Sequence, residues 1–518
     1  MSVKTHALAN LFGRDTATPV TVHTAMPYSI DARHVHVDVS LVSSSRPRLH
    51  DCSSSVDAYR WTETCGQVAR DALTAAGFPQ AASIRVRLSY SGDEVASAAL
   101  AVALGAVAAH DVLPWSALAD VMVLGALTPH GQIEPVRGVL PMLRCLQARG
   151  IATALLPRAN VPEAHLLPGL SLLPADDLRE AIQQLTRRHT VRTVPVTPAS
   201  PARSARGTIG EPLAAVVAGG HPVLLVGGHG SGAALIARDL RHFLPPPSLR
   251  ERFALTLRQS LKTSVSRLAT DRPCEAPHCS VAADVLRGTV QRPGILLLAD
   301  QGVLVLEDID RFNAVALDAV VATVRSGELR VPDRLPGQTV SVPCAPLLVA
   351  TTAACVCGWR GTANRRCHCN ATDLARHYER VPRSIRAVFD VTLWVRTAPT
   401  RTGRRYSAAD IAAARARIAR DARPLTARCA AHVARFLDLV AAAYALSDEE
   451  RGRIARLAGT LAHLRRQDTI TAGMVHQALC WYLGAPESSL SWWARYAARP
   501  SSRPSRRFLV TVPEAMQQ

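Results

Sequence analysis

A glycine-rich stretch in the middle of the chain has the residue types needed to hold a phosphate. Residues 223–226 form a short apolar run that predicts a buried parallel strand, and residues 233–240 have the composition of a helix. A glycine-rich loop at a helix N-terminus can cradle a phosphate with its backbone N–H groups. We therefore predict a nucleotide-binding loop made of Gly227, Gly228, His229, Gly230, Ser231, Gly232, Ala233 and Ala234.

Two side chains that such a loop normally requires are missing. In the pattern G-x-x-x-x-G-K-[ST], the lysine reaches the β/γ-phosphates and the hydroxyl holds Mg²⁺. Ala233 and Ala234 occupy these two positions, and the only lysines of the chain are Lys4 and Lys262. We expect ATP or ADP to bind weakly at most, and Mg²⁺ to lack its usual ligand. The alternative is a glycine-rich turn that serves packing alone.

A second motif supplies carboxylates. Residues 303–306 are apolar and lead directly into Glu307 and Asp308, which is typical of a buried strand that delivers acids to Mg²⁺ and to the attacking water. The usual order is Asp and then Glu, and this chain reverses it. The reversal moves both carboxylates by about one methylene length, and near-attack geometry is sensitive on that scale. Glu307 and Asp308 are the candidate catalytic residues, with inefficient hydrolysis expected. A buried strand that ends in solvated acids is the alternative.

Four cysteines follow the pattern C-x-C, nine residues, C-x-C. This spacing can close a tetrahedral Cys₄ zinc site on a small loop, directly after a predicted strand at residues 347–349. His368 lies inside the second pair and is a competing ligand. Reduced cysteines without a metal are the alternative. The candidate Zn²⁺ ligands are Cys355, Cys357, Cys367 and Cys369.

Composition narrows the class of protein and of partner. A chain of 518 residues with 48% apolar residues supports two to four domains with large cores. The net charge of +19 favours an anionic partner, with nucleic acid first, although a genome rich in arginine codons is the alternative. Aromatic residues make up only 4%, which argues against base-stacking platforms. Twelve cysteines in so long a chain do not indicate a secreted disulfide scaffold.

The motifs require elements that bring them to one place, and the chain divides accordingly. We predict an α/β domain over residues 1–185, a linker over 186–208, a P-loop-type α/β domain over 209–400, an all-helical lid over 401–486 and a basic tail over 487–518. In the first domain, the expected elements include a buried helix over 95–109, a hairpin over 121–141 and a helix over 143–149. In the lid they include helices over 407–422, 430–445, 448–464 and 472–483.

The predicted location follows from what the chain lacks. No stretch approaches 18 consecutive apolar residues, so we predict no membrane span. The first residues contain no apolar segment after Lys4, so we predict no secretory signal and a cytoplasmic protein.

The order and spacing of several stretches resemble the magnesium-chelatase-like AAA+ family of the ComM/YifB type. The matching stretches together span about residues 20–480. They are GQIEPVRGVLP at 131–141, PRAN with EA at 157–164, RP with APHCS at 272–280, the segment 293–308 that ends in LVLED, and the paired cysteines at 355–369.

This resemblance implies a fold and an activity. It implies a Lon-protease-like N-terminal domain without protease activity, an AAA+ core and a helical lid. It also implies a hexameric ring, either homo-oligomeric or mixed with an active paralogue, that moves branched DNA in recombination during natural transformation. If the cysteine-containing loop faces the pore of the ring, its arginines would meet DNA phosphates, with the basic tail adding affinity. The implied DNA-binding residues are Arg360, Arg365 and Arg366.

The resemblance also indicates that several catalytic groups of the family are missing from this chain. Ala353 stands where the family has its sensor asparagine, Val388 at the arginine-finger position and Gly459 at the sensor-2 arginine. We therefore expect a pseudo-ATPase. Two alternatives stay open. One is an active DNA branch-migration motor in which Arg238, or an arginine of a neighbouring subunit, replaces the lysine. The other is a magnesium-chelatase-type ATPase subunit.

Overall fold

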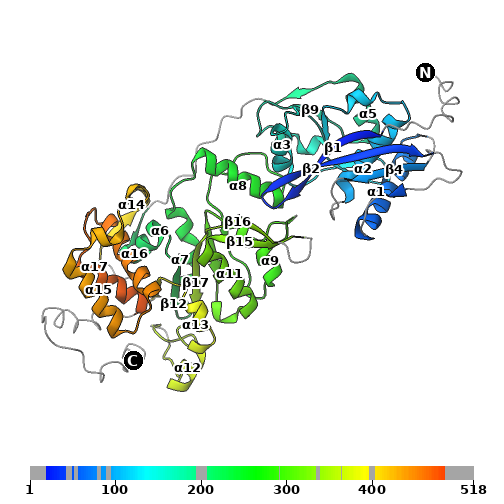
Figure 1. The fold of residues 1–518 in the computed structure, drawn as a ribbon. Coiled ribbons are helices and arrows are strands. Elements are labelled where there is room, and N and C mark those ends of the chain that lie inside the picture. The colour runs from blue at the N-terminus through cyan, green and yellow to red at the C-terminus, as the bar shows by residue number, and fades with distance from the viewer. Residues whose placement is uncertain are drawn as a thin grey trace.

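The computed structural model describes residues 19–42, 50–51, 56–78, 83–88, 95–193, 207–290, 292–333, 339–362, 365–395 and 403–484. Figure 1 shows an N-terminal α/β domain, a central α/β domain and a C-terminal group of helices. The mixed α/β class with a helical C-terminal region is confirmed. The predicted basic tail and the linker residues 194–206 lie outside the described residues. Within these ranges no helix combines the length and apolar character needed to cross a membrane.

The N-terminal domain is built on an eight-stranded sheet with the order β10-β9-β8-β5-β1-β2-β4-β3. The helix α2 covers this sheet and is apolar on every side, which explains why its described side chains are buried. It matches the helix predicted over 95–109. The elements are β1 (Val20–Tyr28), β2 (Asp31–Val42), β3 (His50–Asp51), α1 (Val56–Ala75), β4 (Ser83–Leu88), α2 (Val95–Ala109), β5 (Val121–Val123), β6 (Ala126–Leu127), β7 (Ile133–Glu134), α3 (Val139–Gln147), β8 (Thr153–Leu156), α4 (Val161–Ala164), β9 (Ser171–Pro174), α5 (Leu178–Arg187) and β10 (Val191–Arg192).

Two boundaries of this domain differ from the prediction. The second strand of the hairpin ends at Glu134, and α3 already begins at Val139 because Pro141 is tolerated in a first helical turn. Residues 186–193, predicted as linker, belong to the domain. The helix α5 continues to Arg187, and Val191 of β10 pairs with Leu172 of β9 at the sheet edge. Composition alone gave no sign of this edge strand.

The central domain has a five-stranded sheet with the order β13-β14-β17-β12-β18, and all its pairings are parallel. The carboxyl ends of β12, β14 and β17 therefore meet at one edge, where α/β proteins place ligands. Its elements are β11 (Thr208–Gly210), α6 (Glu211–Gly219), β12 (Val223–Gly227), α7 (Ala233–Asp239), α8 (Leu249–Lys262), β13 (Cys274–Glu275), α9 (Ala283–Arg287), α10 (Ile295–Leu298), β14 (Val303–Leu306), α11 (Ala314–Ser326), β15 (Glu328–Pro332), β16 (Thr339–Pro343), β17 (Leu347–Thr352), α12 (Ala371–Glu379), α13 (Arg383–Arg386) and β18 (Val391–Val395).

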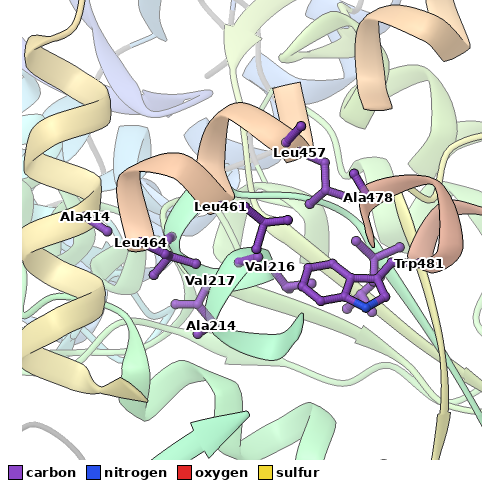
Figure 2. Packing of buried hydrophobic residues seen from close by; sticks show 14 of the residues in the cluster. Ala214, Val216, Val217, Ala414, Leu457, Leu461, Leu464, Ala478 and Trp481 are labelled. Carbon is purple, nitrogen blue, oxygen red and sulfur yellow. The ribbon is translucent and has the colours of Figure 1, made fainter. Parts of the chain in front are cut away.

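The C-terminal helices share a hydrophobic core with one face of this sheet. Figure 2 shows Val216 of α6 beside Leu461, with Trp481 in the same cluster. The Arg465 guanidinium binds the buried Glu211 carboxylate at 2.7 and 2.8 Å, which ties the helices to the start of the central domain. The elements are β19 (Arg405–Ser407), α14 (Ala408–Arg420), α15 (Ala431–Ala443), α16 (Asp448–Leu464) and α17 (Ala472–Leu483).

Candidate nucleotide and metal site

The glycine-rich loop lies where the sequence predicted it, between β12 and α7. Gly230 (φ 73°) and Gly232 (φ 80°) adopt the left-handed conformation that favours glycine. The Ala233 methyl group is buried in the core, whereas Ala234 is exposed at the start of the helix. Neither residue offers a cation or a hydroxyl, so these two positions can contact a phosphate only through the backbone.

The predicted catalytic acids both face arginines at the end of β14. Glu307 is half-buried, and its Oε1 accepts a hydrogen bond of 2.6 Å from Nε of Arg238, which comes from α7. This carboxylate raises the pKa of Arg238. Asp308 is exposed, has a left-handed backbone (φ 53°) and lies 3.8 Å from the Arg311 guanidinium. The Glu307 carboxylate, one of the two acids predicted to serve Mg²⁺ and the attacking water, is therefore paired with the Arg238 guanidinium of its own chain.

Three polar groups at this edge were not predicted as site residues. The backbone N–H of Asp308 donates to the hydroxyl of Thr351 at 3.2 Å. The Thr352 hydroxyl donates to Asp310 at 3.1 Å, and the Asp310 side chain is only 8% exposed. The two threonines end β17 next to β14, so their position in the sheet was the available signal.

The four cysteines converge as predicted. The distances Sγ–Sγ are 3.4 Å for Cys355–Cys357 and 3.6 Å for Cys357–Cys367 and Cys367–Cys355, and the Cys369 sulfur completes a group within 4.8 Å. Four sulfurs placed about 2.3 Å from one zinc ion in a tetrahedron are separated by about 3.8 Å. The observed distances fit this geometry without a fifth ligand from His368.

Backbone amides around the sulfurs also fit a metal centre. The N–H of Arg360 donates to the Cys355 sulfur at 3.4 Å. A hydrogen bond from the Trp359 backbone lowers the pKa of Cys357 to about 6, which favours the thiolate that a metal requires. Burial raises the pKa of Cys367 to about 12. One thiolate is thus already favoured, and a bound cation would be needed to deprotonate its neighbour.

The cysteine loop, residues 355–369 with 363–364 outside the described part, packs directly against the glycine-rich loop. The backbone N–H of His229 donates to the Gly358 carbonyl at 2.7 Å, and the His229 ring meets the Trp359 ring edge-on at 5.2 Å. A Cβ at Gly228 would lie 2.8 Å from the same carbonyl, so only glycine fits there. One amide of the phosphate cradle is therefore already used, and the space above Gly228 is filled.

The predicted DNA-binding arginines differ in accessibility. Arg360 is half-buried, and its Nη2 has no hydrogen-bond partner among the described residues. Arg365 is exposed with its guanidinium 5.3 Å from the centre of the Trp359 ring, and Arg366 is exposed as well. The outer side of the cysteine loop therefore presents two cations to solvent.

The positions that resemble the family's sensor and finger residues have packing roles. The Ala353 carbonyl accepts a 2.8 Å hydrogen bond from His377. Val388 is 3% exposed within the core. A Cβ at Gly459 would lie 2.9 Å from Cδ2 of Leu425, so a side chain at this position would displace the leucine.

Comparisons with known proteins agree with this architecture. Residues 208–402 match the family described as magnesium chelatase, subunit ChlI. An uncharacterized protein of Mycobacterium tuberculosis is 30% identical over 287 residues, which cover 50% of this chain and 56% of the relative. Competence protein ComM of Haemophilus influenzae is 27% identical over 318 residues (58% and 61%), and the uncharacterized protein YifB of Escherichia coli is 26% identical over 315 residues (58% and 61%).

A shorter similarity concerns a protease. The archaeal Lon protease of Pyrococcus abyssi is 29% identical over 99 residues, which cover 18% of this chain and 10% of the relative. The chain aligns with little more than half the length of the ComM, YifB and mycobacterial relatives. Residues 208–402 therefore belong to the magnesium chelatase ChlI family, and the chain is similar to proteins of the ComM/YifB type.

Proposed function

We propose that this protein is a hydrolysis-deficient ComM/YifB-type ring component that associates with DNA in recombination or natural transformation. The observation that carries the proposal is the 2.6 Å contact of Arg238 with Glu307, next to a loop with alanines at the lysine and hydroxyl positions. The acid that would hold Mg²⁺ already has a cationic partner. No group of the loop itself replaces the missing charge.

The chemistry of phosphoryl transfer explains why these losses matter together. Catalysis in this class consists almost entirely of positioning and of stabilising charge on the transferred phosphoryl group. The residues at the lysine, hydroxyl, sensor and finger positions are all uncharged. Loop amides remain as phosphate donors, but the cysteine loop already uses that of His229. Nucleotide binding is therefore weak, and turnover is negligible.

The cysteine quartet fits Zn²⁺ as a structural ion. Cys355, Cys357, Cys367 and Cys369 would hold it, and the ion would supply a fixed cross-link between the two ends of the cysteine loop. Because Gly358 and Trp359 of this loop touch His229, a rigid cysteine loop would hold the glycine-rich loop in place at this residue.

Association with DNA rests on charge. The chain has a net charge of +19, and Arg365 and Arg366 lie exposed on the cysteine loop. Such contacts neutralise phosphates without reading base sequence. The similarity to a competence protein supports DNA as the partner, and the tendency of AAA+ proteins to assemble supports a ring, homo-oligomeric or mixed with an active paralogue.

ATP hydrolysis on purified protein, with and without branched DNA, tests the proposal. We expect turnover far below the range of about 1–100 per second that is typical of phosphoryl-transfer enzymes such as kinases. The alternative of an active motor makes Arg238 the substitute for lysine, and Arg238→Ala would then abolish turnover. Arg241→Ala, an exposed neighbour that does not touch Glu307, is the matched control. Turnover in the usual range that Arg238→Ala removes and Arg241→Ala preserves would establish the motor instead.

A further inference from the structure

Three histidines form a second cluster of metal-type donors, far along the chain from the cysteine loop. His23 lies on β1, and His34 and His36 lie on β2, with His23 directly opposite His36 in the antiparallel register. Since His34 and His36 are two residues apart, their side chains emerge on the same face of the sheet as His23. Each ring has one nitrogen that could bind a metal ion, and these three nitrogens all lie within 4.8 Å of one another.

The rings touch one another, and several of their nitrogens have no protein partner. The ring centroids are 4.3 Å apart for His34–His36, 5.0 Å for His23–His34 and 5.2 Å for His23–His36. Both nitrogens of His34 and Nδ1 of His23 are buried without a hydrogen-bond partner. Buried polar atoms normally find a partner, and an orphaned group calls for an explanation such as an ion.

The surroundings of His23 resemble those of a metal ligand. Burial and the neighbouring His36 lower the pKa of His23, and a hydrogen bond to the Ala119 backbone opposes this shift. A histidine whose far nitrogen donates to a backbone carbonyl keeps the lone pair of the other nitrogen directed at the cluster.

Charged groups flank the cluster on both sides. Asp38 lies two residues beyond His36 on the same face, held by a 2.7 Å hydrogen bond from the Thr21 hydroxyl, and it acts on His23 electrostatically. The exposed Arg149, just after α3, is close enough to act on His23 and His34. A cation held by the imidazoles would be balanced by Asp38, and Arg149 would favour an anion or hydroxide in an open position.

We propose that His23, His34 and His36 bind one divalent transition-metal ion, with Zn²⁺ as the first candidate, and leave its fourth position open. Imidazole nitrogens suit zinc, copper and nickel, and three protein ligands plus water are typical of open zinc sites. The three side chains are half-buried, so the ion has a route from solvent. The site is independent of the cysteine quartet and of the proposed function.

Metal analysis of the full chain tests the proposal, after removal of metal with a chelator and reloading with Zn²⁺ alone. We expect the His site to bind one equivalent beyond the cysteine quartet. A Cys355→Ser, Cys367→Ser variant should keep this equivalent, whereas His34→Gln should weaken its binding about 100-fold or more. His165→Gln, a half-buried histidine outside the cluster, is the matched control. Equal zinc binding by wild type and His34→Gln would overturn the proposal.

A measurement without substitutions guards against a variant that fails to fold. In the electron paramagnetic resonance spectrum of wild-type protein whose cysteine quartet already holds Zn²⁺, and to which one equivalent of Cu²⁺ is then added, we expect couplings to several nitrogens. A spectrum without nitrogen couplings would refute the three-imidazole site. Binding of inorganic phosphate to metal-free protein that competes with Zn²⁺ would instead identify the cluster with Arg149 as an anion site, and would equally refute it.

Discussion

Glu163 is a buried carboxyl group at the contact between the N-terminal and central domains. It lies on α4 and has no exposed surface, and its Oε2 accepts a 3.4 Å hydrogen bond from Ser264 of the central domain. Its Oε1 is buried without a partner. Ser260 of α8 reinforces the contact, since its carbonyl accepts the N–H of Gly138 at 2.8 Å. Figure 1 shows α8 between the two domains.

Burial raises the pKa of Glu163 from 4.5 to about 7, although hydrogen bonds from Ser260 and Ser264 oppose the rise. Such a shift corresponds to about 3 kcal/mol of preference for the neutral carboxyl. Because the closed contact binds the proton more tightly than the opened one, stability is greatest below pH 4.5. It falls as pH rises from 4.5 to 7, and the full cost is present above pH 7. Between pH 5 and pH 8 about 2.5 kcal/mol is lost, or roughly 70-fold in the opening equilibrium.

Glu163→Gln removes this titration while keeping the side-chain volume. We expect the protection of α4 and α8 amides against hydrogen exchange, corrected for intrinsic rates, to fall roughly 70-fold from pH 5 to pH 8 in wild type and to change little in the variant. Glu134→Gln, an exposed carboxyl on the same domain, is the control and should behave as wild type. Parallel pH profiles for wild type and Glu163→Gln would refute the reasoning.

Three further predictions concern the central domain and the lid. A Cys367→Ala, Cys369→Ala variant should lose one equivalent of Zn²⁺ and melt at a lower temperature; metal analysis with unchanged zinc content would contradict the Cys₄ site. In filter binding to duplex DNA, replacing Arg365 and Arg366 with alanine should reduce the slope of log affinity against log salt by about 2. If the wild-type protein does not bind DNA at low salt, codon usage is the better account of the positive charge. Gly459→Arg should destabilise the lid by about 1–3 kcal/mol in denaturant unfolding, because a Cβ there would lie 2.9 Å from a leucine methyl group. We also expect that this variant does not restore ATP turnover. An unchanged unfolding midpoint would contradict the first expectation.

The sequence predicted those elements whose signals are local. Helices over 448–464 and 472–483 were predicted with the observed ends. In the structure, Ser447 and Thr471 are their N-caps and accept hydrogen bonds from the first turn. The capping box of Ser407 with Asp410 likewise starts α14. The glycine-rich loop and the cysteine quartet depend on spacing within a few residues, so the structure places both as expected.

Contacts between distant residues were beyond such reasoning. Nothing in the composition of α7 indicates that Arg238 reaches Glu307, 69 positions later. The contact of Gly358 with His229 and the hydrogen bond of Ser264 to Glu163 also join separate segments. Each depends on the order of strands in a sheet or on the docking of two domains, and a single sequence does not encode these in any local pattern.

Under the proposed function, the missing lysine, hydroxyl and sensor groups are not isolated gaps in an otherwise normal ATPase site. The Arg238 guanidinium pairs with the Glu307 carboxylate, and the Gly358 carbonyl accepts a hydrogen bond from the His229 amide. A Cβ at position 459 would press against a leucine side chain. Effects of residues that act as one catalytic unit are strongly non-additive, so returning a lysine to position 233 alone would leave the other obstacles in place. Under the proposed function, any movement of a ring that contains this chain draws its energy from another subunit.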